Sequence, residues 1–125
     1  MRRDEREITS IDEIYDILTR CDVIRLSMND TPYPYCIPMT FGVEKKEDKI
    51  IIYLHSAKEG KKWELLDKDN HVCIEADLYY HTVKEGDAIT AKYESVIGFG
   101  KVEKLDEQQD KVAAFKVMLA HYKEK

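Results

Sequence analysis

Residues Ile50–Leu66 read IIIYLHSAKEGKKWELL, and the interpretation of the whole chain starts from this stretch. The run Ile50–Leu54 is β-branched, aromatic and apolar, which predicts a buried strand. The polar and small residues His55–Ala57 suit a turn, and helical spacing begins at Glu59. The stretch therefore predicts a strand that passes through a turn into the start of a helix.

Three lysines, Lys58, Lys61 and Lys62, lie within one turn of this helix start. A helix start directs several backbone N–H groups and the positive end of the helix dipole towards one point. Lysine side chains beside that point would complete a phosphate cradle. A solvated lysine face on a surface helix explains the same residues, and these residues alone leave both interpretations open.

The composition predicts a single globular domain over residues 1–125. Hydrophobic residues make up 43% of the chain and charged residues 36%, and no apolar run is long enough to span a membrane. The net charge of −5 disfavours nucleic acid as a partner. Cys21, Cys36 and Cys73 form no CxxC pair, and the basic N-terminus precedes no apolar segment. We therefore expect a cytoplasmic protein with reduced cysteines in its core.

Turn residues and periodicity divide the chain into helices and antiparallel strands. Helices are predicted to start at Ser10, Glu59 and Asp106, and strands are predicted at Asp22–Asn29, Tyr33–Glu44, Lys49–Leu54, His71–Leu78 and Ala88–Leu105. Residues 79–87 are predicted to be a polar loop, and the last helix to carry an apolar stripe of Val112, Phe115, Leu119 and Tyr122. Long strands joined by short turns indicate a mainly β, barrel-like sheet with flanking helices.

Two prolines interrupt the second predicted strand. Because proline cannot donate to a strand ladder, Pro34 and Pro38 predict a break around Ile37–Thr40. A broken ladder leaves backbone groups free to face a ligand, although an ordinary edge strand is also compatible with the prolines.

The familiar motifs of metal sites, nucleophilic catalysis and nucleotide binding are missing from the sequence. The four histidines, His55, His71, His81 and His121, show no HxxH or HExxH spacing and do not pair with the cysteines, so no metal site is predicted. There is no GxSxG, GxGxxG or P-loop. We therefore expect any chemistry to belong to a bound cofactor.

Four blocks, in this order, resemble the pyridoxamine-phosphate-oxidase-like flavoproteins, in the branch that includes nitroimidazole-resistance reductases. They are MRRDEREI at 1–8, PYPYCIPMTFGV at 32–43, IIIYLHSAKEGKKWELL at 50–66 and YESVIGFGKVEKL at 93–105. The resemblance implies an antiparallel split β-barrel homodimer that binds FMN at the subunit interface. It departs from the family pattern in one respect, because the strand that usually follows the last helix and ends near Thr-Gly-Lys is missing here.

Carried onto this chain, the family pattern implies three groups of cofactor-binding residues. Pro38, Met39 and Thr40 would line the isoalloxazine, and His55, Ser56 and Ala57 with Lys61 and Lys62 would hold the ribityl and phosphate end. Glu94 and Ser95 of the partner subunit would close the site. The resemblance thus favours the phosphate cradle over the solvated lysine face.

The function implied is that of an FMN-dependent oxidoreductase. It would take hydride from a nicotinamide donor and pass electrons to a small acceptor, with a nitroaromatic as one candidate. Relatives also include pyridoxamine phosphate oxidases, deazaflavin-dependent reductases and haem binders. A non-catalytic flavin- or haem-binding module and a dimeric scaffold with an empty site therefore remain open. No catalytic side chain is predicted, and residues for a pyridoxal phosphate substrate are not evident.

A twofold homodimer is expected because a chain of this size has a limited core and a flavin ring needs a wall on each side. The apolar residues of the last predicted strand could supply the shared surface. They are Tyr93, Val96, Ile97 and Phe99.

Overall fold

The computed structural model describes residues 10–55 and 60–123, and only the backbone of residues 79–81. In chain order the elements are α1 (Ile11–Arg20), β1 (Ile24–Met28), β2 (Tyr35–Met39), β3 (Phe41–Lys46), β4 (Lys49–Leu54), α2 (Lys61–Lys68), β5 (His71–Glu85), β6 (Ala88–Lys101) and α3 (Gln108–Tyr122). In these described ranges, no helix is long and apolar enough to span a membrane.

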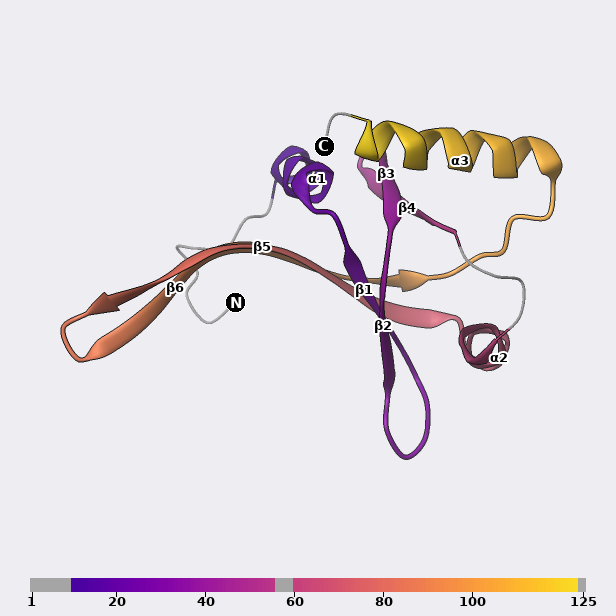
Figure 1. Ribbon diagram of the computed structural model, residues 1–125. Helices are drawn as coiled ribbons and strands as arrows, with labels where there is room; N and C mark the ends of the chain where they lie inside the picture. Colours follow the sequence, from indigo (N-terminus) through magenta and orange to yellow (C-terminus); the bar gives the residue numbers. More distant parts are fainter. Residues whose placement is uncertain (1–9, 56–59, 124–125) are drawn as a thin grey trace.

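The strands form two antiparallel sheets, as the sequence predicted. One sheet has the order β2-β1-β5-β6, and the other is the β3-β4 hairpin. The four-stranded sheet curls, and β5 and β6 continue beyond it as a long two-stranded ribbon (Figure 1). The helix α3 lies over β3 and β4, while α2 lies at the far end of the curled sheet. This is the expected mainly β, split-barrel type of fold with flanking helices.

The strand predicted at Tyr33–Glu44 is interrupted where the prolines indicated. It ends as β2 at Met39 and resumes as β3 at Phe41, so only Thr40 separates two strands of different sheets. Pro38 lies in β2, the edge strand opposite Arg25, where its missing N–H costs no ladder hydrogen bond on the outer side. The break at Thr40 thus joins the two sheets.

The prediction of a polar loop at residues 79–87 is wrong. The pairing of β5 with β6 runs through this segment as far as Glu85 and Ala88, with an irregularity between Tyr79 and His81. Only Gly86 and Asp87 form the turn, and Gly86 has a φ of 61°, which favours glycine. The polar side chains misled the prediction because a two-stranded ribbon exposed on both faces needs no apolar alternation.

The core is built where α1 meets β1 and β3. The Ser10 Oγ accepts the N–H of Glu13 at 3.5 Å and caps α1, as predicted. The alternating residues Ile24, Leu26 and Met28 of β1 are buried, also as predicted. A first cluster of buried side chains surrounds the fully buried ring of Phe41, and a second joins β1 to Leu65 and Leu66 of α2. Both clusters therefore hold α2 and the Thr40 break in fixed positions.

The predicted face of the last helix is wrong. Val112, Phe115 and Leu119 are exposed, whereas Ala114 and Met118 are buried. Gly42 of β3 explains the difference, because a Cβ at this position would lie 2.8 Å from the backbone N and Cα of Met118. The helix therefore approaches β3 by its backbone, and its small and flexible side chains face the sheet. Its N-cap is Glu107 and not the predicted Asp106.

The cysteines are free, but only one lies in the core. Cys21 is fully buried, Cys73 is half-buried and Cys36 is exposed on β2. The prediction of reduced thiols is compatible with this arrangement, and the prediction that all three are core residues is wrong for Cys36.

Candidate functional site

The start of α2 has backbone donors without a side-chain cap. The carbonyl of Gly60 accepts the N–H groups of Trp63 at 3.1 Å and Glu64 at 3.2 Å, and no side chain caps this end. The first amides of a helix, here those of Lys61 and Lys62, have no partner within the helix. Gly60 has a φ of 136° and no atom within 4 Å of a Cβ position, so the approach to these amides is open. The geometry suits an anionic group bound from outside the helix.

The two lysines of this turn have different surroundings. The Lys61 Nζ lies 3.3 Å from Oδ2 of Asp30 and 4.9 Å from the ring centroid of Tyr35. Lys62 is half-buried, and burial lowers its pKa. Its Nζ lies 5.8 Å from the Trp63 ring, and in the described part of the chain no carboxylate forms an ion pair with it. A phosphate beside Lys62 would supply the missing countercharge, so the residues present suit such a group.

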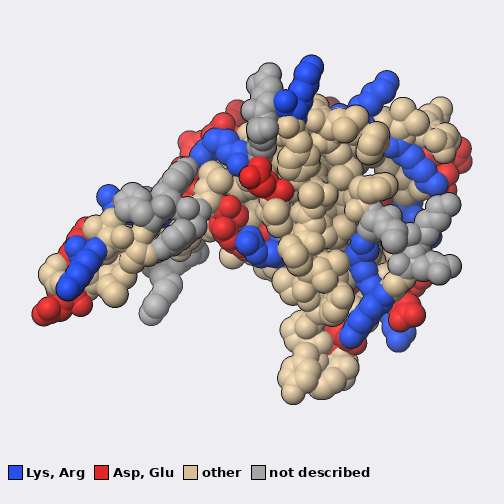
Figure 2. Space-filling view, viewed as in Figure 1, with Lys and Arg blue, Asp and Glu red and all other residues tan. Residues whose placement is uncertain are grey.

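Basic side chains gather around α2 although the protein is acidic overall. Figure 2 shows lysines beside the end of the molecule where α2 lies. Lys61, Lys62 and Lys68 come from the helix itself, and Lys104 reaches it from the segment after β6, with its Nζ 5.0 Å from the Trp63 ring. The positive charge is therefore local, as the sequence indicated, and favours a small anion over a polyanion.

The residues predicted to line the isoalloxazine lie at the junction of the two sheets. Pro38 and Thr40 are exposed, whereas Met39 is half-buried and packs against both core clusters. Since successive strand residues point to opposite faces, Pro38 and Met39 cannot both present side chains to one ring. The exposed face of this junction is therefore formed by Pro38, Thr40 and the backbone.

His55 lies at the end of β4, and Ser56 and Ala57 lie outside the described residues. The His55 side chain is exposed, and its ring centroid is 6.2 Å from that of Phe115 on α3. The chain leads from β4 through His55 towards Gly60, so His55 and the lysines of α2 lie on the two sides of one connection (Figure 1). This brings the exposed Phe115 next to the predicted ribityl region, which the sequence did not indicate.

Glu94 and Ser95 lie far along β6 from the other candidates. Glu94 accepts a hydrogen bond from Arg20 of α1 at 2.6 Å, and Ser95 is exposed opposite Asp77. Glu94 precedes the end of β6 at Lys101 by about 23 Å of extended strand, and Lys101 pairs with the first residue of β5, close to the end of α2. Within one chain, Glu94 and Ser95 are not brought together with the lysines of α2.

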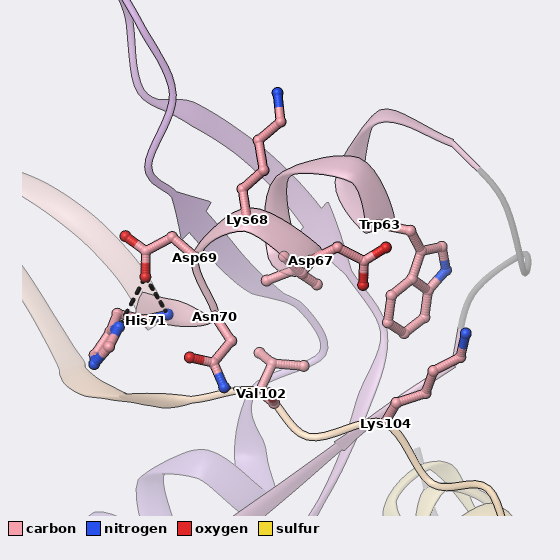
Figure 3. A pocket seen from close by; sticks show the side chains of 9 residues that line it. Trp63, Asp67, Lys68, Asp69, Asn70, His71, Val102 and Lys104 are labelled. Atoms are coloured by element: carbon pink, nitrogen blue, oxygen red, sulfur yellow. Dashed lines mark hydrogen bonds and ion pairs between the residues drawn. The ribbon is translucent and has the colours of Figure 1, made fainter.

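A hollow of about 400 Å³ lies at the carboxyl end of α2 (Figure 3). Trp63 and Lys104 face each other across one side of it, and Asp69 and His71 lie at the other. Asp69 accepts the ring Nδ1–H of His71 at 2.8 Å and its backbone N–H at 3.1 Å, and these bonds with one from Asn29 hold the pKa of Asp69 near 2. Sequence reasoning did not predict this hollow, although the polar run DKDNH after the helix was a signal of an exposed helix end.

The described histidine, cysteine and acidic residues include no group of three or more that could hold a metal ion. The nearest resident chemistry is therefore the anion-binding start of α2.

Comparison with known proteins identifies the family. A family model described as pyridoxamine 5'-phosphate oxidase matches residues 10–125. The chain belongs to the pyridoxamine 5'-phosphate oxidase family. This confirms the resemblance derived from the four sequence blocks. A comparison with curated proteins gives no match.

Several solved structures share the fold. A candidate 5-nitroimidazole antibiotic resistance protein from Bacteroides thetaiotaomicron has 32% identity and a TM-score of 0.80, covering 92% of this chain and 68% of its own. The flavocytochrome of Azotobacter vinelandii has 13% identity and a TM-score of 0.72, covering 95% of this chain and 58% of its own. An FAD and heme binding protein from Mycobacterium smegmatis has 15% identity and a TM-score of 0.76, covering 90% of this chain and 54% of its own. The chain thus spans little more than half the length of the latter two structures, and these two support the fold alone.

Proposed function

We propose that this member of the pyridoxamine 5'-phosphate oxidase family is an FMN-dependent oxidoreductase. It takes a hydride from a reduced nicotinamide and passes electrons to a small acceptor, with a nitroaromatic as the first candidate. The observation that carries this proposal is the uncapped start of α2, where free amides adjoin the half-buried Lys62. The relative from Bacteroides thetaiotaomicron supports the choice of a nitroaromatic.

The residues of the chain bind and orient the cofactor. The amides of Lys61 and Lys62 and the ammonium of Lys62 hold the phosphate, with Ser56 and Ala57 of the preceding segment at the ribityl end. The exposed face formed by Pro38, Thr40 and their backbone supports the ring system. When bound, FMN supplies the hydride-accepting N5 atom, and for this reason no side chain is assigned a catalytic role.

The choice of FMN over FAD is part of the proposal. A relative from Mesorhizobium loti that is described as FAD-binding has 23% identity and a TM-score of 0.65, covering 92% of this chain and 77% of its own. A terminal phosphate suits an uncapped helix start with one charge-bearing lysine in need of a partner. Comparing FMN, FAD and riboflavin by titration therefore tests the cofactor directly.

The proposed site is completed by a second copy of the chain. Tyr93, Ile97 and Phe99 of β6 are exposed, whereas Val96 packs against the core, so three of the four predicted interface residues are free to meet a partner. Because Glu94 and Ser95 lie far from α2 in their own chain, they reach a flavin only as residues of the partner subunit.

The free cysteines agree with the proposed location in the cytoplasm. None of Cys21, Cys36 and Cys73 forms a disulfide, as is usual in a reducing compartment.

Absorption spectroscopy of the purified protein, before and after addition of FMN, tests the proposal. Flavin bands that stay with the protein on gel filtration and bleach with NADH or NADPH are the expected result. Flavin bands without nicotinamide oxidation would instead indicate a binding module, and a Soret band a haem protein. No bound chromophore after FMN addition would contradict the proposal and leave a scaffold.

A further inference from the structure

An ion pair ties the start of α2 to the tip of the β1–β2 hairpin. The Lys61 Nζ lies 3.3 Å from Asp30 Oδ2, and the same ammonium lies 4.9 Å from the Tyr35 ring centroid. Asp30 is separated from Lys61 by α2 and three intervening strands in sequence, so the contact joins two distant segments. The two groups hold Lys61 away from the neighbouring Lys62, which forms no ion pair with a described carboxylate.

Asp30 is itself fixed in place. Its Oδ1 accepts the N–H of Thr31 at 2.8 Å, a bond that lowers the pKa of Asp30, and Lys61 lowers it further. The carboxylate therefore carries a full negative charge at neutral pH beside the first turn of α2. Its side chain is 24% exposed and that of Lys61 is 55% exposed, so water screens the pair only in part.

Resting on the proposed function, we propose that Asp30 limits the affinity for the flavin phosphate by competing for Lys61. A dianion at the start of α2 attracts both lysines, but Lys61 already has a carboxylate partner. Binding the phosphate through Lys61 would break this ion pair and place two anions near each other. Lys62 therefore carries most of the charge-assisted binding, and Asp30 determines how strongly the site distinguishes FMN from riboflavin.

This proposal predicts a gain of binding upon removal of one charge. Asp30→Asn keeps an oxygen for the Thr31 N–H and has nearly the same shape, but it releases Lys61 and removes a negative charge. We expect Asp30→Asn to tighten FMN binding roughly three- to tenfold and to leave riboflavin binding unchanged. The gain should vanish in Asp30→Asn/Lys61→Ala, while Lys61→Ala alone should change FMN binding less than about twofold.

Fluorescence titration of the wild type and these three variants with FMN and riboflavin measures each arm, and Asp30→Ser replaces Asp30→Asn if the latter does not fold. Unchanged or weaker FMN binding by Asp30→Asn would overturn the proposal, because a residue that positioned Lys61 would weaken it. A gain that persists without Lys61 would overturn it too. If the wild type binds FMN but Asp30→Asn has no effect, only this inference fails. If the wild type does not bind FMN at all, the proposed function fails with it.

Discussion

The hydroxyl of Tyr122, in the last turn of α3, accepts the backbone N–H of Phe41 at 2.9 Å. The same hydroxyl donates to the carbonyl of Asp22 at 2.7 Å, so one side chain joins α3 to the beginning of β3 and to the segment before β1. Phe41 is fully buried and directly follows the break at Thr40. Burial raises the pKa of Tyr122, which keeps its hydroxyl protonated and able to donate. The hydroxyl therefore fixes the strand that leads away from the candidate flavin-binding junction.

Tyr122→Phe is expected to lower the free energy of unfolding by about 1–3 kcal/mol, because the N–H of Phe41 loses its acceptor in a buried place. Urea unfolding of the protein without cofactor measures the change. Tyr53→Phe is the matched control, since the Tyr53 hydroxyl donates only to the half-exposed Glu44 at 3.3 Å. Equal effects of the two substitutions would show that the position of Tyr122 is not special.

Gly42→Ala is expected to destabilise the protein by about 1–3 kcal/mol, because a Cβ would lie 2.8 Å from the backbone of Met118 and α3 would have to move. The substitution Gly100→Ala is the control, because nothing lies within 4 Å of its Cβ position and β6 is exposed there. We expect this control to stay within about 0.5 kcal/mol of the wild type. Thermal unfolding of both variants checks the difference, and a harmless Gly42→Ala would mean that α3 packs less closely.

The sequence was sufficient to predict the strand order and the Thr40 break, but not the face of α3. Alternation in β1 and the prolines of β2 are local signals, and local signals were enough for those elements. The orientation of α3 depends on Gly42, a residue about seventy positions earlier, so no periodicity within the helix could reveal it. The ribbon of residues 79–87 was missed for a related reason, since its order comes from pairing between strands.

For the candidate site, the sequence indicated residue types but not partners. It located the lysines at the helix start, and the structure adds that Asp30 occupies Lys61 while Lys62 is half-buried. A contact between a hairpin tip and a helix thirty residues later has no sequence signature. The same holds for the distance between Glu94 and α2, which depends on the register of β5 and β6.

Asp69→Asn is expected to destabilise the protein at neutral pH but not near pH 2. The folded-state pKa of Asp69 is lowered from 3.8 to about 2, chiefly by His71. Its contribution is therefore present above the unfolded-state value and is lost as the pH falls towards 2. Melting temperatures of the wild type and Asp69→Asn should converge between pH 5 and about pH 2. Asp67→Asn, which removes a neighbouring exposed carboxylate, should show no such convergence, and a constant difference for Asp69→Asn would contradict the assignment.

Phe99→Lys is expected to weaken the proposed homodimer. Phe99 is 84% exposed and Ile97 is 64% exposed on the same face of β6, an apolar surface that a second copy would cover. Light scattering at micromolar concentration with FMN present should give about twice the chain mass of 14.7 kDa for the wild type and less for the variant. Leu119→Lys on the exposed face of α3 is the control and should leave the mass unchanged. A wild-type mass near one chain would argue against the dimer.

Lys62→Ala is expected to weaken FMN binding roughly ten- to a hundredfold, because a charge-assisted hydrogen bond to a phosphate contributes about 1.5–3 kcal/mol. Riboflavin lacks the phosphate, so its affinity should change much less. Since burial lowers the pKa of Lys62 and no described carboxylate pairs with it, its loss should leave the melting temperature of the protein without cofactor little changed. For the same reason, the affinity for FMN should fall on the alkaline side as Lys62 loses its proton, and this fall should be absent in Lys62→Ala.

The control for this prediction is Lys46→Ala. Lys46 lies at the end of β3 and pairs with Glu44 at 3.3 Å, far from α2 in the fold, so its removal should not affect FMN binding. Fluorescence titrations with FMN and riboflavin across a range of pH compare the three proteins. If Lys62→Ala and Lys61→Ala both bind FMN as the wild type does, the lysines are a solvated helix face and the phosphate lies elsewhere. If Lys62→Ala weakens FMN and riboflavin equally, Lys62 supports the ring or the fold, because a loss that does not depend on the phosphate cannot come from binding it.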